Sequence, residues 1–305
     1  YYLVLSGDQL YRMDYRKLLA GHLRSSADVT IATLPVSKEP AKGFGIMHTH
    51  NDGQITRFVE KPQQDELLDE LKMPADMLSN CGIPNDSERY LASMGIYLFN
   101  RETLEQYLDN DMVDFGKNVI PSVIKGNKVM SHVFQDYWED IGTIGAFFKA
   151  NLDMAKILPD YDFFYPDAQI YTNSRYLPAS KINAATIKES IVADGCILTD
   201  THLEKCVIGV RSIIGNGSHL TQTVVMGADQ YQSEWLEENP GSPPFGIGRD
   251  CRIHRAIIDK NAHIGDGVMI NPEDKPAHHD GENFFIRDGI VVIPKNAVVP
   301  AGTAI

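Results

Sequence analysis

The chain has 305 residues with 43% apolar and 23% charged side chains, a composition typical of a globular protein with one large domain or two ordinary ones. Its 28 Lys and Arg face 41 Asp and Glu, and the net charge of -13 argues against general binding to nucleic acid or an anionic membrane, which both need a basic surface. No apolar run is long enough to span a bilayer, and 4 cysteines without CxxC or metal-ligand spacing favour reduced, buried thiols in a cytosolic protein.

The first half of the chain alternates strand-like and helix-like stretches, which predicts an α/β sheet with mostly parallel strands. The apolar run 2–5 is typical of a buried parallel strand, and its place at the start leads us to expect further sequence upstream of Tyr1. The polar stretch 63–88 is predicted to be a surface excursion. The other predicted strands are 29–34, 44–48, 55–59, 94–99 and 128–134, and the predicted helices are 15–24, 101–108 and 118–124.

A further helix is predicted from Ile144 to about Ile157, with Thr143 as its N-cap, because apolar residues recur there at helical spacing. The stretch that follows is rich in Pro, Asp and Tyr, and we interpret it as a linker. We therefore expect a first domain over 1–157, a linker over 158–177 and a second domain over 178–305.

From about Pro178 the helical spacing gives way to a six-residue period, which is typical of a parallel β-helix built from hexapeptide repeats. A single coil cannot bury its apolar face, so several coils must stack. Residues 228–246 interrupt the period and are predicted to form an inserted loop. The aliphatic positions that carry the period are Ile208, Ile214, Leu220 and Met226, then Ile258, Ile264 and Ile270, then Ile293, Val299 and Ile305.

Charged residues stand at three strand ends or helix starts of the first half. Asp8 follows the first strand at the edge where open α/β sheets bind ligands, and its carboxylate could hold Mg²⁺, although taken alone it is better explained as a turn cap. Glu60 could accept hydrogen bonds from sugar hydroxyls and Lys61 could hold a phosphate, with a solvated charge pair as the alternative. Asp140 precedes a helix N-terminus, which favours anions, and helix capping explains it equally well.

These motifs occur in a recognisable series. In order along the chain stand GDQLYRMDY, GFGIM, FVEKP, LASMGIYLF, DFGKNVIP, YWEDIGT and MGAD, together with the hexapeptide repeats. The series resembles the ADP-glucose pyrophosphorylase (glucose-1-phosphate adenylyltransferase) family from Tyr1 to Ile305. The resemblance implies a mostly parallel, Rossmann-like nucleotidyltransferase sheet, here incomplete at its N-terminus, followed by a left-handed β-helix for oligomerisation and regulation. It also implies transfer of the adenylyl group of ATP to glucose 1-phosphate, the first committed step of glycogen and starch synthesis.

The resemblance further implies roles for single residues and for partners. It implies an anionic allosteric metabolite, a homotetramer, and a location in the cytoplasm, or in the plastid of a plant. The stretch 114–117 matches a family motif whose role the residues do not reveal. The matched site residues are Asp8 and Asp140 for Mg²⁺ and catalysis, Gly45, Glu60, Lys61, Ser93 and Trp138 for glucose 1-phosphate, and Lys260 and Lys295 for the effector.

The chain departs from the family in one respect, because it does not contain the glycine-rich loop that cradles the triphosphate. We therefore expect the chain as it stands not to form ADP-glucose at a measurable rate.

Three alternatives stay open: another sugar-1-phosphate nucleotidyltransferase, a non-catalytic regulatory subunit, and a hexapeptide-repeat acyltransferase. The presence of Asp8 and Asp140 argues against the second. The third needs a catalytic His, and a lone His on a coil is more often a surface residue. Its candidates by residue type are His202, His219, His254 and His263.

Overall fold

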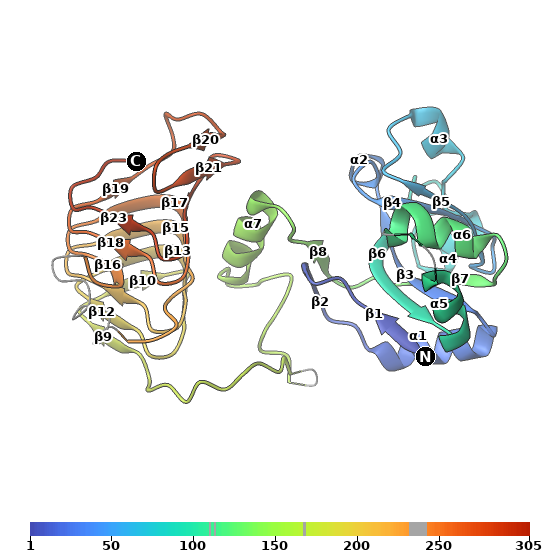
Figure 1. The fold of residues 1–305 in the computed structure, drawn as a ribbon, viewed down its shortest axis with the longest axis horizontal. Helices are drawn as coiled ribbons and strands as arrows, with labels where there is room; N and C mark the ends of the chain where they lie inside the picture. Colours follow the sequence, from blue (N-terminus) through green and yellow to red (C-terminus); the bar gives the residue numbers. More distant parts are fainter. Residues whose placement is uncertain (110, 113, 167–168, 232–242) are drawn as a thin grey trace. The chain divides into compact units, whose positions relative to one another are not determined.

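The structure, a computed structural model, describes residues 1–109, 111–112, 114–166, 169–231 and 243–305. The chain divides into two compact units, Tyr1–Trp138 and Glu139–Ile305, and each is described by itself. Figure 1 shows a sheet with helices in the first unit and successive coils of short strands in the second. Within the described ranges, no helix combines the length and the apolar character that crossing a membrane requires.

The first unit is built on a mixed sheet with the strand order β5-β4-β6-β3-β7 and with β1 paired to β6. Its strands are β1 (Tyr2–Val4), β2 (Gln9–Tyr11), β3 (Val29–Val36), β4 (Gly45–Thr49), β5 (Ile55–Glu60), β6 (Tyr90–Phe99) and β7 (Val129–Val133). Only β3 and β7 run parallel among the described pairs of this sheet, so the expectation of mostly parallel strands is wrong here. One reason is the short turn from His50 to Gln54, which can join β4 and β5 only as an antiparallel hairpin.

The opening strand β1 differs most from its prediction. It pairs antiparallel with β6, and Tyr2 and Leu3 are 43% and 38% exposed. Only Val4 of this strand packs against the apolar core of the unit. At this position, the apolar run therefore does not indicate a buried parallel strand.

Helices cover the sheet of the first unit. They are α1 (Tyr15–Ser25), α2 (Lys38–Ala41), α3 (Asp65–Asp69), α4 (Ala75–Asn80), α5 (Arg101–Leu108), the π-helical turn η1 (Phe115–Val119) and α6 (Ile120–Ile124). The predicted surface excursion 63–88 holds α3 and α4, and it buries Leu68, Leu71 and Met77. Most of the stretch is exposed, as predicted, but its polar composition concealed these few buried apolar residues.

The second unit begins within the short strand β8 (Trp138–Asp140) and continues with α7 (Ile144–Met154). Thr143 caps α7 as predicted, because its hydroxyl accepts a hydrogen bond from the Ala146 N–H at 3.2 Å. The helix ends at Met154, before the predicted Ile157. Phe148 packs α7 against the β-helix side chains Val224, Ile257 and Ile290. The contacts therefore group α7 with the β-helix, although the predicted domain limit placed it in 1–157.

The β-helix predicted from the hexapeptide period is present. Its strands are β9 (Lys181–Asn183), β10 (Thr186–Lys188), β11 (Ile191–Val192), β12 (Ile197–Thr199), β13 (His202–Ile208), β14 (Ile213–Ile214), β15 (His219–Val225), β16 (Gly246–Ile247), β17 (Arg252–Ile258), β18 (His263–Ile264), β19 (Met269–Ile270), β22 (Ile290–Ile293) and β23 (Val298–Val299). All the described pairs among these strands are parallel.

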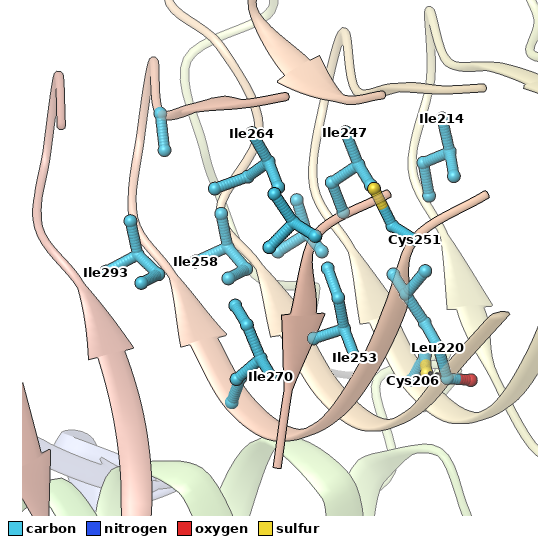
Figure 2. Packing of buried hydrophobic residues seen from close by; sticks show 14 of the residues in the cluster. Cys206, Ile214, Leu220, Ile247, Cys251, Ile253, Ile258, Ile264, Ile270 and Ile293 are labelled. Carbon is cyan, nitrogen blue, oxygen red and sulfur yellow. Dashed lines mark hydrogen bonds between the residues drawn. The ribbon is translucent and has the colours of Figure 1, made fainter. Parts of the chain in front are cut away.

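The hexad residues point into the coils and stack from one coil to the next. Ile258, Ile264 and Ile293 are at most 1% exposed, and Figure 2 shows their side chains in one continuous apolar core. Met226 is the exception, because it is half-buried and packs against the α7 side of the coils. The predicted loop 228–246 separates β15 from β16, and its central part, 232–242, lies outside the described residues.

One feature of the second unit has no counterpart in the predictions. Near the end of the β-helix, β20 (His279–Asp280) and β21 (Phe285–Arg287) run antiparallel to their neighbours, and β21 forms a hairpin with β22.

Candidate functional site

A gap in the pairing of β6 marks the site in the first unit. β4 pairs with Leu91 and Ala92, and β1 pairs with residues 97–99. Both lie on the edge of β6 that faces away from β3, because β3 also pairs with residues 97–99. Residues 93–96 therefore pair with neither β1 nor β4, so Ser93 and Gly95 stand at an opening in the strand pairing between β4 and β1.

The turn that holds Asp8 lies at this opening. A Cβ on Gly95 would lie 3.2 Å from the side-chain nitrogen Nε2 of Gln9 and 3.5 Å from Ser6 Cβ. Asp8 is exposed, and its Oδ1 accepts a hydrogen bond of 2.6 Å from the Ser6 hydroxyl. Gly95 has a left-handed φ of 67°, a conformation that glycine adopts without strain. Because it has no side chain, it leaves room for this turn.

Trp138 closes a second side of the opening. Its indole N–H donates a hydrogen bond of 3.3 Å to the Gln9 side-chain oxygen, and its ring meets Phe44 edge-on at 5.4 Å. Phe44 directly precedes Gly45, so Trp138 connects the Asp8 turn with the start of β4. The predicted pocket residue is thus a half-buried wall with one apolar face.

Two glycines make room for the carboxylate of Glu60. Gly45 and Glu60 are cross-strand partners, and a Cβ on Gly45 would overlap the Phe58 ring and lie 2.9 Å from Glu60 Oε2. A Cβ on Gly116 would lie 3.2 Å from the same oxygen. Gly45 therefore shapes the space around an acceptor, and Gly116 is a second such residue that sequence reasoning did not single out.

The motif 114–117 forms another wall of the candidate site. The Asp114 carboxylate accepts the Lys117 N–H at 2.8 Å and so begins the π-helical turn η1, a rare conformation that is frequent at functional sites. Phe115 stacks on Tyr97 with ring centres 5.7 Å apart. The structure thus gives this motif a place beside Glu60 that its residues alone did not reveal.

The pKa of Tyr97 reflects the charges in this region. Burial raises the pKa of its hydroxyl first of all, its hydrogen bond with Ser93 lowers the pKa, and the nearby carboxylates of Glu60 and Asp114 raise it. Tyr97 is 7% exposed, and its oxygen lies 3.5 Å from the Ser93 hydroxyl. The surroundings of Tyr97 therefore gather two carboxylates and two hydroxyls, a set suited to hydrogen-bonding a polyhydroxylated ligand.

Lys61 follows directly after Glu60 and is exposed. Its φ of 47° is left-handed, which is uncommon for a residue with a side chain, and its N–H is held by Phe44 O at 3.0 Å. The nearby Lys38 and Lys42 form ion pairs with Asp65. Lys61 forms no ion pair with any described residue, so its charge is available to an anionic ligand.

Asp140 belongs to the second unit and is exposed at the end of β8. Its Oδ1 accepts the Gly142 N–H at 2.9 Å, which folds the chain into the start of α7. No group of three or more His, Cys, Asp or Glu side chains in the described part of the chain could hold a metal. Asp8 and Asp140 each accept from a neutral donor, and their remaining oxygen lone pairs suit a hard cation such as Mg²⁺.

The two predicted effector lysines meet at one carboxylate in the second unit. Lys260 Nζ lies 3.1 Å from Asp229 Oδ1, and Lys295 Nζ lies 3.3 Å from Asp229 Oδ2. The hydrogen bond from Lys260, followed by those from Asn261 and Lys295, lowers the pKa of Asp229 to about 2. The structure thus brings together lysines from two different coils, and it adds Asp229 of the MGAD motif, which sequence reasoning had left without a role.

The histidines considered for acyl transfer have structural partners. His254 Nδ1 lies 2.7 Å from the Thr221 hydroxyl, and the buried His263 ring contacts the Pro243 carbonyl oxygen at 2.8 Å. The rings of His202 and His219 pack against each other at 5.5 Å.

Comparisons with known proteins match both units. Residues 1–157 match the family model of nucleotidyl transferases, and residues 175–304 match the GLGC left-handed parallel β-helix domain. Over 319 aligned residues, the chain is 40% identical to the chloroplastic/amyloplastic small subunit of glucose-1-phosphate adenylyltransferase of Triticum aestivum. The alignment covers 100% of this chain and 66% of that protein, so the chain spans about two-thirds of the relative's length.

Proposed function

Because the chain belongs to the ADP-glucose pyrophosphorylase family, we propose that it transfers the adenylyl group of ATP to glucose 1-phosphate. The observation that carries this proposal is the group of polar side chains formed by Glu60, Ser93 and Tyr97, together with Lys61, which follows Glu60 and forms no ion pair with any described residue. Hydroxyl-binding groups beside a free cation are complementary to a sugar that carries a phosphate.

In this reaction, a phosphate oxygen of glucose 1-phosphate attacks the α-phosphorus of ATP. A new P–O bond forms as the bond to the β-phosphate breaks, and pyrophosphate leaves. Such chemistry depends on positioning and charge neutralisation more than on an acid–base pair. Glu60 would orient the sugar hydroxyls, and Lys61 would hold the attacking phosphate. We propose Asp8 and Asp140 as ligands of Mg²⁺, which would neutralise charge on the phosphates.

Assays with purified, active protein that contains this sequence test the proposal. We expect pyrophosphate release with ATP and glucose 1-phosphate, and a markedly lower rate with GTP, UTP or dTTP, or with other sugar phosphates. Preference for another nucleotide or sugar would favour a different sugar-1-phosphate nucleotidyltransferase. No turnover, combined with stimulation of a catalytic partner subunit, would favour a regulatory subunit, which the small-subunit name of the wheat relative keeps as the second candidate.

We also propose a homotetramer, located in the cytoplasm or a plastid, that an anionic metabolite regulates through Lys260 and Lys295. Support for the regulatory part comes from the convergence of both lysines on Asp229. In the structure a carboxylate sits between two cations, which is the arrangement that an anionic effector would adopt.

Lys260→Ala and Lys295→Ala should each raise the effector concentration needed for half-activation by roughly tenfold, because each removes a charged hydrogen-bond donor. Basal activity without effector should stay close to that of the parent protein. Activity titrated against fructose 6-phosphate, fructose 1,6-bisphosphate and 3-phosphoglycerate measures the effect. Lys188→Ala is the matched control, because Lys188 is a β-helix lysine paired with Glu204. Unchanged activation curves in both variants would exclude the two lysines from the effector site.

A further inference from the structure

The hairpin between β21 and β22 turns through two residues in left-handed conformations. Asp288 and Gly289 have φ angles of 55° and 67°, and they join the paired residues Arg287 and Ile290. An Asp-Gly pair is favoured in this two-residue turn, because both central residues need positive φ. The sequence therefore builds a tight turn with an exposed carboxylate at its tip.

The carboxylate at the tip reaches the first turn of α7. Asp288 Oδ2 accepts a hydrogen bond of 3.2 Å from the N–H of Gly145, the second residue of the helix. This N–H is one of the donors that a helix start leaves without a partner, and the positive end of the helix dipole favours the negative charge. Gly145 is needed for the approach, because a Cβ there would lie 2.9 Å from the same oxygen.

Arg255 of β17 holds the hairpin tip in place. Its Nε donates to Gly289 O at 2.9 Å, and its Nη2 lies 3.5 Å from Asp288 O. Its guanidinium group also stands 5.8 Å from the ring centre of Phe148, the buried anchor of α7. The turn, the neighbouring coil and the helix are thus connected by one side chain, so the position of Asp288 relative to α7 is fixed.

Two carboxylates and one hydroxyl fix the short segment from Asp140 to Ala146. The Asp140 side chain accepts from Gly142 N, Thr143 caps Ala146 N, and Asp288 binds Gly145 N. The first two contacts are local in sequence, whereas the third comes from the far end of the β-helix. It is therefore a polar contact from a remote part of the chain, and it adds to the apolar packing of Ile144 and Phe148 against the β-helix.

We infer that Asp288 is a positioning residue for Asp140: by anchoring the start of α7 to the β-helix, it sets where the Asp140 carboxylate is held. The inference rests on the role of Asp140 in the proposed function. It assigns to the β21–β22 hairpin a part in the reaction.

The test compares Asp288→Ala, Asp288→Asn and the parent protein. Asp288→Ala removes the acceptor, so we expect faster hydrogen–deuterium exchange in peptides that cover 140–147, by roughly tenfold at the Gly145 amide. In active protein, kcat should fall and the Mg²⁺ concentration for half-maximal rate should rise, each by roughly five- to tenfold, with KM for glucose 1-phosphate nearly constant. Asp288→Asn keeps an oxygen that can accept the same N–H and should recover most of both effects.

Asp280→Ala is the matched control. Asp280 is an exposed residue of β20, the strand that pairs with β21, and its carboxylate pairs with Arg287 and not with α7. Equal changes in this control would show that the hairpin is merely destabilised, and would overturn the inference. Unchanged exchange at 140–147 in Asp288→Ala would overturn it as well.

Asp140→Asn separates the inference from the proposed function. If kcat collapses in Asp140→Asn but stays at the parental value in Asp288→Ala, only the inference fails. If Asp140→Asn keeps the parental kcat, the proposed role of Asp140 fails and the inference fails with it. A collapse in Asp140→Asn together with the changes expected for Asp288→Ala supports both.

Discussion

Asp8→Asn and Asp140→Asn should each lower kcat by roughly 10³ or more in active protein that contains this sequence, because we expect each carboxylate to contribute about 4 kcal/mol of transition-state stabilisation. An amide retains the shape of the side chain and can still accept the hydrogen bonds from Ser6 and Gly142. The substitutions therefore remove charge while they leave the local folds in place. KM for glucose 1-phosphate should change far less, because the sugar contacts lie on other residues.

Steady-state measurements of kcat and KM at saturating and at limiting Mg²⁺ test this prediction. Asp52→Asn is a suitable control, because Asp52 is another exposed turn aspartate of the first unit, whose Oδ1 accepts from Gln54 N at 3.0 Å. It should keep the parental kcat. If either test variant stayed within a few-fold of the parent, that aspartate would not be a metal ligand.

The β-helix could be predicted from the sequence because its rule is local and repeated. Ile258 and Ile264 occupy equivalent positions in successive hexads, and both are at most 1% exposed. The sheet of the first unit has no such repeat. The strand direction of β6 depends on its long-range partners β3 and β4, and the apolar residues of β1 did not reveal that this strand is exposed.

The candidate site could be predicted only where a residue carries recognisable chemistry. Glu60 and Lys61 were identified in this way; in the structure Gly45 and Gly116 lie beside the Glu60 carboxylate, and Lys61 forms no ion pair with any described residue. Tyr97 was missed, and Gly116 entered only within the motif 114–117, because neither type of residue signals a function until its neighbours are known. Asp114 drew attention only as part of a motif. Its distance from Glu60 along the chain concealed that both carboxylates raise the pKa of Tyr97.

Partners from remote parts of the chain were beyond sequence reasoning for the same reason. Asp229 bridges two lysines from different coils, and Asp288 reaches a helix more than a hundred residues upstream. Each is an ordinary exposed aspartate in the sequence. Only the stacking of the coils, which sets Lys260 beside Lys295, and the tight Asp-Gly turn give these carboxylates their partners.

Lys61→Ala is expected to raise KM for glucose 1-phosphate roughly ten- to hundred-fold, because a charge-assisted hydrogen bond contributes about 1.5–3 kcal/mol. The KM for ATP should stay nearly constant. Alanine keeps a Cβ, so the left-handed backbone at φ 47° is no less strained than in the parent, and the change isolates the lost ammonium group.

Initial rates over a matrix of both substrate concentrations provide the two KM values for Lys61→Ala. Lys42→Ala is the matched control: Lys42 is a lysine of the same region that already pairs with Glu39 and Asp65, so both KM values should stay at the parental level. Lys61→Arg should restore part of the affinity for the sugar phosphate, because a guanidinium group keeps the charge but not the compact geometry of an ammonium group. An equal rise of both KM values in Lys61→Ala would mean that the pocket has lost its fold, and an unchanged KM for glucose 1-phosphate would place the phosphate elsewhere.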